Sequence, residues 1–140
     1  MDREYYLTLA KVRYERAREL LEEAKLLLEK EAYKSANNRS FYAIEKSVKA
    51  LLATEETEIT THSGGLKQFN YYFIHKGDGT FTSDDYQIIA RAEQIRTFSD
   101  YDDFYIASKQ EAREQVISAE EFLEKVGKYL SGLEGYQKEE

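Results

Sequence analysis

The residues of this sequence that could do chemistry are concentrated at positions 96–105, which read Arg-Thr-Phe-Ser-Asp-Tyr-Asp-Asp-Phe-Tyr. If a helix continues past position 99, Arg96 and Asp100 lie one turn apart and can form an ion pair. An arginine held in this way can bind phosphate through its planar donors, with Tyr101 or Tyr105 donating a hydrogen bond or stacking. The structural alternative is an ion pair at a helix end, with aromatic rings closing a bundle.

A second candidate site is the basic face of a helix expected at positions 36–54. Spacings of three and four residues place four side chains on this face: Arg39, Tyr42, Lys46 and Lys49. Its cations could add to a phosphate site around Arg96. Alternatively, the face is solvated and Arg39 is paired with an acidic residue. The sequence leaves both interpretations open.

Histidine and serine residues offer few further sites. His62 precedes Ser63 and two glycines at an expected helix start, where free backbone amides could hold an anion, or where the histidine could serve as a cap. His75 has no neighbouring partner pattern, and Ser63 lacks the Gly-x-Ser-x-Gly surroundings of an exposed nucleophile. No glycine pattern of a phosphate or dinucleotide loop occurs. With two histidines and no cysteine, we expect neither a metal ion nor a cofactor.

The composition is that of a single globular domain with an acidic surface. Its 140 residues are enough to bury about two thirds of the unfolded surface. The net charge of −7 argues against binding long nucleic acid over the whole surface, but it allows a local cationic pocket. The first residues show no signal-peptide pattern, and no run reaches the roughly 18 apolar residues of a membrane span. We therefore expect a cytoplasmic protein with no membrane partner.

Helical periodicity predicts an all-α protein. The expected helices are, in order, positions 2–30 with Asp2 as cap, 36–54, a short helix from 63, one from Thr82 or Ser83, and one from a capping box at Ser108 to a left-handed cap at Gly132. Positions 100–107, dense in aspartate and aromatic residues, should connect the last two. Long amphipathic helices with short reversals are typical of a four- to five-helix up-and-down antiparallel bundle. We predict one such domain at residues 1–132 and a flexible tail at 133–140.

The helix at positions 36–54 should lie between other helices because two of its three faces are suited to packing. One face carries small side chains: Ala36, Ser40, Ala43, Ser47 and Ala50. A second face is large and apolar: Phe41, Ile44, Val48 and Leu51. Small residues let a neighbouring helix approach closely, and the apolar face must be buried. Only the basic face is then left for solvent, a cleft or a partner.

Several segments in this order resemble the HEPN domain, and more narrowly its small stand-alone bacterial and archaeal branch. The similarity extends from about Tyr14 to Leu130. The segments that carry it are residues 33–43 (Tyr-Lys-Ser-Ala-Asn-Asn-Arg-Ser-Phe-Tyr-Ala), 49–52 (Lys-Ala-Leu-Leu), 62–64 (His-Ser-Gly), Arg96 with 100–105 (Asp-Tyr-Asp-Asp-Phe-Tyr), and the long C-terminal helix.

The resemblance implies a four- or five-helix bundle that pairs as a two-fold homodimer. Many family members are encoded with a minimal nucleotidyltransferase as toxin–antitoxin pairs. Active members are metal-independent ribonucleases with an arginine followed, after four to six residues, by a histidine. These residues of two protomers meet at the dimer seam, and RNA is cut with the help of its own 2′-hydroxyl.

Arg96 matches the arginine of that motif, but Tyr101 stands where its histidine belongs. Tyrosine is a poor general base near neutral pH, and losing a general acid–base typically costs about 10²–10⁴ in rate. The resemblance therefore implies RNA or nucleotide binding with a degenerate catalytic position formed by Arg96, Asp100 and Tyr101. Residues expected to add phosphate or RNA contacts are Arg39, Tyr42, Lys46, His62 and Tyr105.

Two alternatives remain open for the function. In the first, the protein is still an active metal-independent endoribonuclease toxin despite Tyr101, which leaves open whether it is an enzyme. In the second, it is a non-catalytic docking partner for a minimal nucleotidyltransferase and uses its acidic, tyrosine-rich surface, with Tyr101 and Tyr105 as candidate acceptors of transferred nucleotides.

Overall fold

The computed structural model describes residues 3–57 and 62–136, and within these ranges it contains helices and connections but no strand. The elements are α1 (Arg3–Glu29), α2 (Tyr33–Ala53), α3 (His62–Phe69), a π-helix η1 (Asn70–His75), α4 (Ser83–Tyr101) and α5 (Lys109–Ser131). The prediction of an all-α bundle is confirmed. Asp2, expected to cap the first helix, lies outside the described residues.

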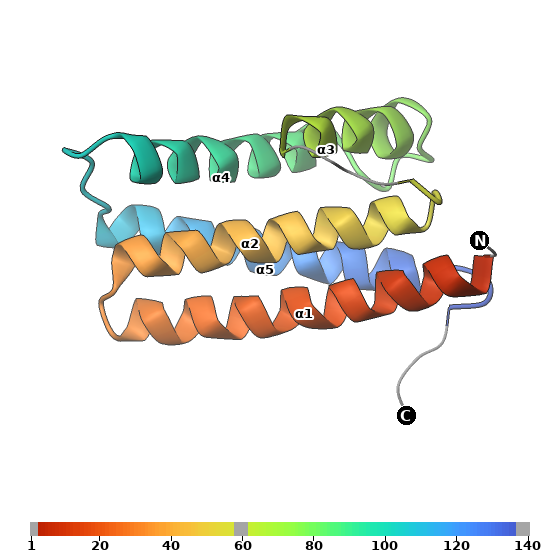
Figure 1. Ribbon diagram of the computed structural model, residues 1–140, viewed down its shortest axis with the longest axis horizontal. Coiled ribbons are helices and arrows are strands. Elements are labelled where there is room, and N and C mark those ends of the chain that lie inside the picture. Colours follow the sequence, from red (N-terminus) through yellow and green to blue (C-terminus); the bar gives the residue numbers. More distant parts are fainter. Residues whose placement is uncertain (1–2, 58–61, 137–140) are drawn as a thin grey trace.

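The long helices alternate in direction, as an up-and-down bundle requires. Figure 1 shows α2 between α1 and α4, with α5 packed behind them. The chain runs one way along α1, returns along α2, crosses back along α4 and returns again along α5. As a result, the end of α4 and the beginnings of α2 and α5 lie at the same end of the bundle.

The hairpin of α1 and α2 buries small side chains, which allow helices to approach one another. Its reversal is tight, with Glu31 in the left-handed region at φ 62°. Two contacts set the register: Arg13 with the carbonyl of Lys49, and Glu23 with Arg39. Three alanines of each helix are fully buried: Ala10, Ala17 and Ala24 on α1, and Ala36, Ala43 and Ala50 on α2.

The central position predicted for the second helix is also confirmed. Its small-residue face and its apolar face are both buried, including the hydroxyl-bearing Ser40 and Ser47 at 0% exposure. The third face, with Arg39, Tyr42 and Lys46, is only half-buried. Because the other two faces are filled by neighbouring helices, this face supplies the polar side chains that α2 presents outward.

One end of the bundle is closed by an aromatic cluster. The short α3 passes directly into η1, and together they place Phe69 and Phe73 against rings from the other elements. The cluster consists of Phe69, Phe73, Phe81, Phe122 and Tyr129, with neighbouring centroids 5.5–6.2 Å apart. The sequence predicted the short helix from position 63 but not the π-helical turn that follows it.

The starts of α4 and α5 are capped as the sequence predicts. Thr82 and Asp85 form a capping box, and the buried Asp85 carboxylate also accepts a 2.9 Å contact from Lys125. At α5 the Ser108 hydroxyl accepts from the amide of Glu111 at 3.0 Å. Asp85 therefore joins the start of α4 to α5.

Two helix ends differ from the predictions. The connection expected from position 100 begins later because α4 continues through Tyr101. Gly132 has φ −84°, so the left-handed cap predicted there is wrong; its amide still bonds to carbonyls of the last turn, and the left-handed glycine is Gly135 at φ 89°. Of the segment predicted as a tail, Leu133 and Tyr136 pack against the core, while residues 137–140 lie outside the described part.

Candidate functional site

Arg96 lies where α4 crosses the first half of α2. Its guanidinium is 5.2 Å from the centre of the Phe41 ring, an arrangement in which the ring face attracts the cation. The arginine side chain is 19% exposed, so most of its length is covered while its end remains accessible. Phe41 belongs to the buried apolar face of α2 and therefore gives the arginine a rigid support.

Two polar groups orient the Arg96 guanidinium. Asp100, one turn later on α4, places its carboxylate 3.5 Å from Nη2. Burial by itself would lower the pKa of Arg96, but a hydrogen bond with the Tyr42 side chain and the charge of Asp100 outweigh it and raise the pKa. The arginine is therefore held permanently charged between α4 and α2.

Part of the hydrogen-bonding capacity at this end of the bundle is unused. The buried Nε of Arg96 has no hydrogen-bond partner among the described residues, and neither does the hydroxyl of Ser99 one turn away. On α2 the same holds for Ser40 Oγ and Asn37 Oδ1. Buried polar atoms without partners are rare and costly. A planar guanidinium can donate a pair of parallel hydrogen bonds to an anion.

The connection after α4 presents an exposed aromatic surface. Tyr101 is 80% exposed, Phe104 92% and Ile106 87%. Tyr105 is tethered instead: its ring stacks on Phe98 at 6.4 Å and its hydroxyl donates to the Glu111 carboxylate. The phenol of Tyr101 thus lies free beside the Arg96 site, whereas that of Tyr105 is engaged in the fold.

The structure does not bring all of the predicted phosphate ligands together. Arg39 points toward α1, where its Nε forms a 2.9 Å ion pair with Glu23. Of the two interpretations of the basic face, the structure therefore supports the one in which Arg39 is paired with an acidic residue. His62 begins α3, and its side chain lies outside the described part of the chain. Lys46 is half-buried on the same face of α2 as Tyr42, one turn further along.

The sequence analysis missed the role of Phe41, which it assigned only to the core. Its ring supports Arg96 from below and also contacts Tyr42, at a centroid distance of 5.2 Å. The available signal was the adjacency of Phe41 and Tyr42 at the border between the apolar and basic faces of α2. The core of the candidate site is therefore Arg96, Asp100, Tyr42 and Phe41.

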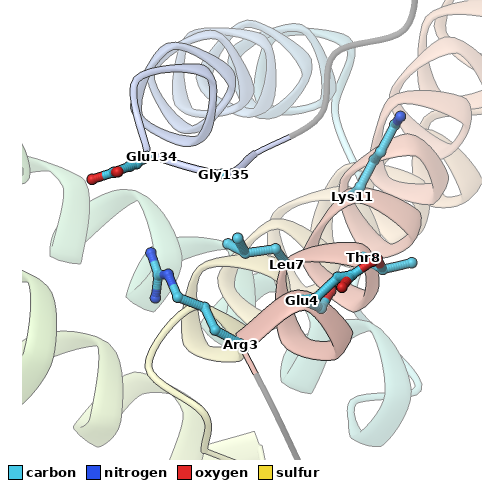
Figure 2. A pocket seen from close by; sticks show the side chains of 7 residues that line it. All are labelled: Arg3, Glu4, Leu7, Thr8, Lys11, Glu134 and Gly135. Atoms are coloured by element: carbon cyan, nitrogen blue, oxygen red, sulfur yellow. The ribbon is translucent and has the colours of Figure 1, made fainter.

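Two hollows of the surface lie apart from this site. Figure 2 shows a pocket of about 720 Å³ at the opposite end of the bundle, between the start of α1 and the segment after α5, lined by Arg3, Glu4, Leu7, Thr8, Lys11, Glu134 and Gly135. A shallower groove between α3 and α4 is bordered by Leu66 and Phe98. Neither includes a residue predicted for the functional site. Among the described helices, none is both long and apolar enough to cross a membrane.

Comparison with known proteins agrees with this architecture. The family model of the HEPN domain matches residues 10–129, which include all four core residues of the site. The chain therefore belongs to the HEPN domain family.

Three relatives cover most of their own length and of this chain. A Methanocaldococcus jannaschii protein with the name "Putative toxin MJ0605" is 34% identical over 118 residues, 84% of this chain and 85% of the relative. A "UPF0332 protein" of Thermotoga maritima is 33% identical, covering 84% and 88%. A second M. jannaschii protein, "Putative toxin MJ0142", is 34% identical, covering 83% and 78%.

Proposed function

We propose that this protein is the HEPN component of a toxin–antitoxin pair and that it binds RNA or nucleotide phosphate through Arg96. The observation that carries the proposal is the state of this arginine: charged, supported by Phe41 and oriented by Asp100. Two relatives that carry the word toxin in their names support the toxin–antitoxin setting.

The chemistry of the site favours binding over cleavage. The guanidinium would hold a phosphate by charge-assisted hydrogen bonds, while Asp100 fixes its rotamer and the Tyr42 hydroxyl lies beside it. Tyr101, at the position of the motif histidine, can donate a hydrogen bond or stack on a base, since its ring is exposed. With tyrosine in place of the motif histidine, proton transfer from the 2′-hydroxyl lacks an efficient base at that position.

The same proposal includes a two-fold dimer formed at the Arg96 end. Phe98, Phe104 and Ile106 expose large apolar side chains at and after the end of α4, and such groups on a surface commonly mark a contact with another protein. Pairing there would bring two Arg96 side chains to one seam and shield the phosphate from water. Sedimentation analysis of the purified protein tests this part; a monomer at every concentration would contradict it.

The binding test compares Arg96→Ala with Arg113→Ala, which removes an equally charged, exposed residue of α5. Titration calorimetry with mononucleotides and short single-stranded RNA should show that Arg96→Ala loses about tenfold or more in affinity, since charge-assisted bonds contribute about 1.5–3 kcal/mol. Arg113→Ala should bind like the parent. Unchanged binding by Arg96→Ala would refute the assignment. Incubation with RNA, without metal, tests for the cyclic-phosphate products of an active ribonuclease.

The acidic, aromatic connection favours one further candidate function, docking of a nucleotidyltransferase. Asp102 and Asp103 lie between the exposed Tyr101 and Phe104 in the sequence, so a partner with basic and apolar groups would fit. Co-purification with the product of the neighbouring reading frame tests this candidate. Capture that survives Arg96→Ala but is lost in Phe104→Asp would favour docking; capture unaffected by Phe104→Asp would exclude this surface.

A further inference from the structure

A second group of cations lies on the outward face of the α1–α2 hairpin. Arg13 of α1 reaches across to α2, where its Nη1 donates a 3.1 Å hydrogen bond to the main-chain carbonyl of Lys49. The ammonium group of Lys49 is 3.9 Å from Glu45, its neighbour one turn earlier. Arg13 is thereby fixed against α2 although it comes from a different helix, and it adds a guanidinium to the basic face.

Lys46 is the centre of this group. It is half-buried, and no acidic side chain lies within ion-pair distance of it among residues 3–57 and 62–136. Its burial and the nearby charges of Lys49 and Arg13 lower its pKa, which only Glu45 opposes appreciably. A chain of net charge −7 thus gathers Arg13, Lys46 and Lys49 at one place, with Glu45 beside them. Such an arrangement is relieved when an anion binds.

The group is continuous with the Arg96 site. Tyr42 lies one turn before Lys46 on the same face of α2, and its hydroxyl interacts with Arg96 of α4. Figure 1 shows α2 flanked by α1 on one side and α4 on the other, so both arginines reach the α2 face from its two neighbours. From Tyr42 to Lys49 the helix rises about 10.5 Å, which is too far for a single phosphate to span.

We propose that Arg96, Tyr42, Lys46, Lys49 and Arg13 form one track that binds the backbone of single-stranded RNA through at least two phosphates. The partly exposed ring of Tyr42 lies among the cations. Proteins that bind single-stranded nucleic acid without sequence preference combine positive charge with aromatic side chains in this way. An acidic protein segment would use the cations but not the ring. The inference rests on the proposed function, because Arg96 is one end of the track.

The experiment measures how affinity for RNA depends on salt and on length. The test variant is Lys46→Gln/Lys49→Gln, and the matched control is Arg113→Gln/Lys128→Gln, which removes the same charge from exposed positions of α5. Fluorescence anisotropy uses a labelled oligouridylate of about twelve nucleotides, within the site sizes of single-strand binders. Each lost phosphate contact should reduce the slope of log affinity against log salt by about 0.7 for a single strand.

The test variant should therefore lose about 1.4 from this slope, while the control keeps the slope of the parent. A uridine dinucleotide, too short for the whole track, should bind both variants alike and should depend on Arg96. Circular dichroism establishes that each variant is folded. A deoxyuridylate of equal length should bind nearly as well, since the track contacts the backbone.

The outcomes separate the track from the Arg96 site. If Arg96→Ala abolishes binding but Lys46→Gln/Lys49→Gln has the slope of its control, the track is refuted and the Arg96 site stands. If the reverse holds, the assignment of Arg96 fails, and the track as proposed is overturned at its Arg96 end. Absence of RNA binding by the parent overturns both. Vesicles of anionic phospholipid that bind in place of RNA, with the same lysine dependence, would also overturn the track.

Discussion

Both ends of this bundle are aromatic, but the two clusters are in opposite states. The closed aromatic cluster of Phe69, Phe73, Phe81, Phe122 and Tyr129 packs ring against ring, and Phe69 is fully buried. The open aromatic cluster consists of Phe98, Tyr101, Phe104 and Tyr105, with the aliphatic Ile106 next in sequence. It contains one stacked ring pair, and Tyr101, Phe104 and Ile106 are at least 80% exposed. Composition alone would not tell them apart.

The difference comes from the segments that cover each end. Between α2 and α4 the chain contains α3 and η1, whose rings close one end. Between α4 and α5 only a short connection follows, and it contains no helix that could cover its own rings. Apolar surface left exposed in this way costs solubility unless it contacts a partner. The open end also contains the unpartnered Arg96 Nε, so exposure and unused hydrogen bonding coincide there.

The largest effect should separate the two clusters directly. Phe69→Ala removes a fully buried ring that contacts three others, and we expect the free energy of unfolding to fall by about 3–5 kcal/mol. Phe104→Ala removes a ring that is 92% exposed, and the change should stay within about 0.5 kcal/mol. Urea unfolding, followed by circular dichroism at several protein concentrations, measures both.

Varying the protein concentration distinguishes dissociation from unfolding, because a dimer contact at the open end would make the midpoint depend on concentration. A loss for Phe104→Ala as large as that for Phe69→Ala, independent of concentration, would show that the open cluster is part of the core. The contrast between the two ends would then be lost.

A smaller effect is expected from the acidic residues at the two ends. Asp85 is buried, accepts the amide of Thr82 and pairs with Lys125 at 2.9 Å, so Asp85→Ala should lower the free energy of unfolding by about 2 kcal/mol. Asp100 is partly exposed and pairs only with Arg96 in its own helix, so Asp100→Ala should cost less than about 1 kcal/mol. Thermal unfolding at low and high salt provides the measurement.

The control for this pair of variants is the comparison of their losses of stability at low and high salt. The effect of Asp100→Ala should fade at high salt, where exposed ion pairs are screened, while that of Asp85→Ala should persist because its cap is a hydrogen bond. Equal losses at both ends, or a loss at Asp85 that vanishes with salt, would contradict the assignment of Asp85 as a structural acid.

Much of the fold followed from the sequence because local rules agree with the packing. The two buried faces of α2, the tight reversal before it and the Ser108 cap each depend on spacings within a few residues. The π-helix η1 was not foreseen, because a single widened turn leaves the apolar pattern nearly unchanged. Gly132 failed as a left-handed cap because residue type permits that conformation without requiring it.

The candidate site was predictable to the extent that its contacts are local. Arg96 and Asp100 are one helical turn apart, and their ion pair follows from that spacing. Two other contacts depend on the register of the α1–α2 hairpin, which the sequence of one helix does not specify. They are the ion pair of Arg39 with Glu23 and the hydrogen bond from Arg13 to the Lys49 carbonyl. The role of Phe41 could not be predicted for the same reason, because its contact with Arg96 joins α2 to α4.

The smallest expected effect is a difference in stability at alkaline pH between variants of two tyrosines, one near each end of the bundle. Tyr136, packed against the core after α5, is half-buried, and burial raises the pKa of its phenol to about 12. The unfolded phenol titrates near pH 10, so this group's contribution to stability is complete below about pH 10 and is lost as the pH rises to about 12. In urea unfolding at about pH 8 and pH 11, Tyr136→Phe should therefore show a smaller alkaline loss of stability than the parent.

Tyr101→Phe, which removes an exposed phenol, is the control and should lose as much stability as the parent. An identical alkaline loss in both variants would mean that Tyr136 is as accessible as Tyr101, and the segment after α5 would then no longer count as part of the closed end.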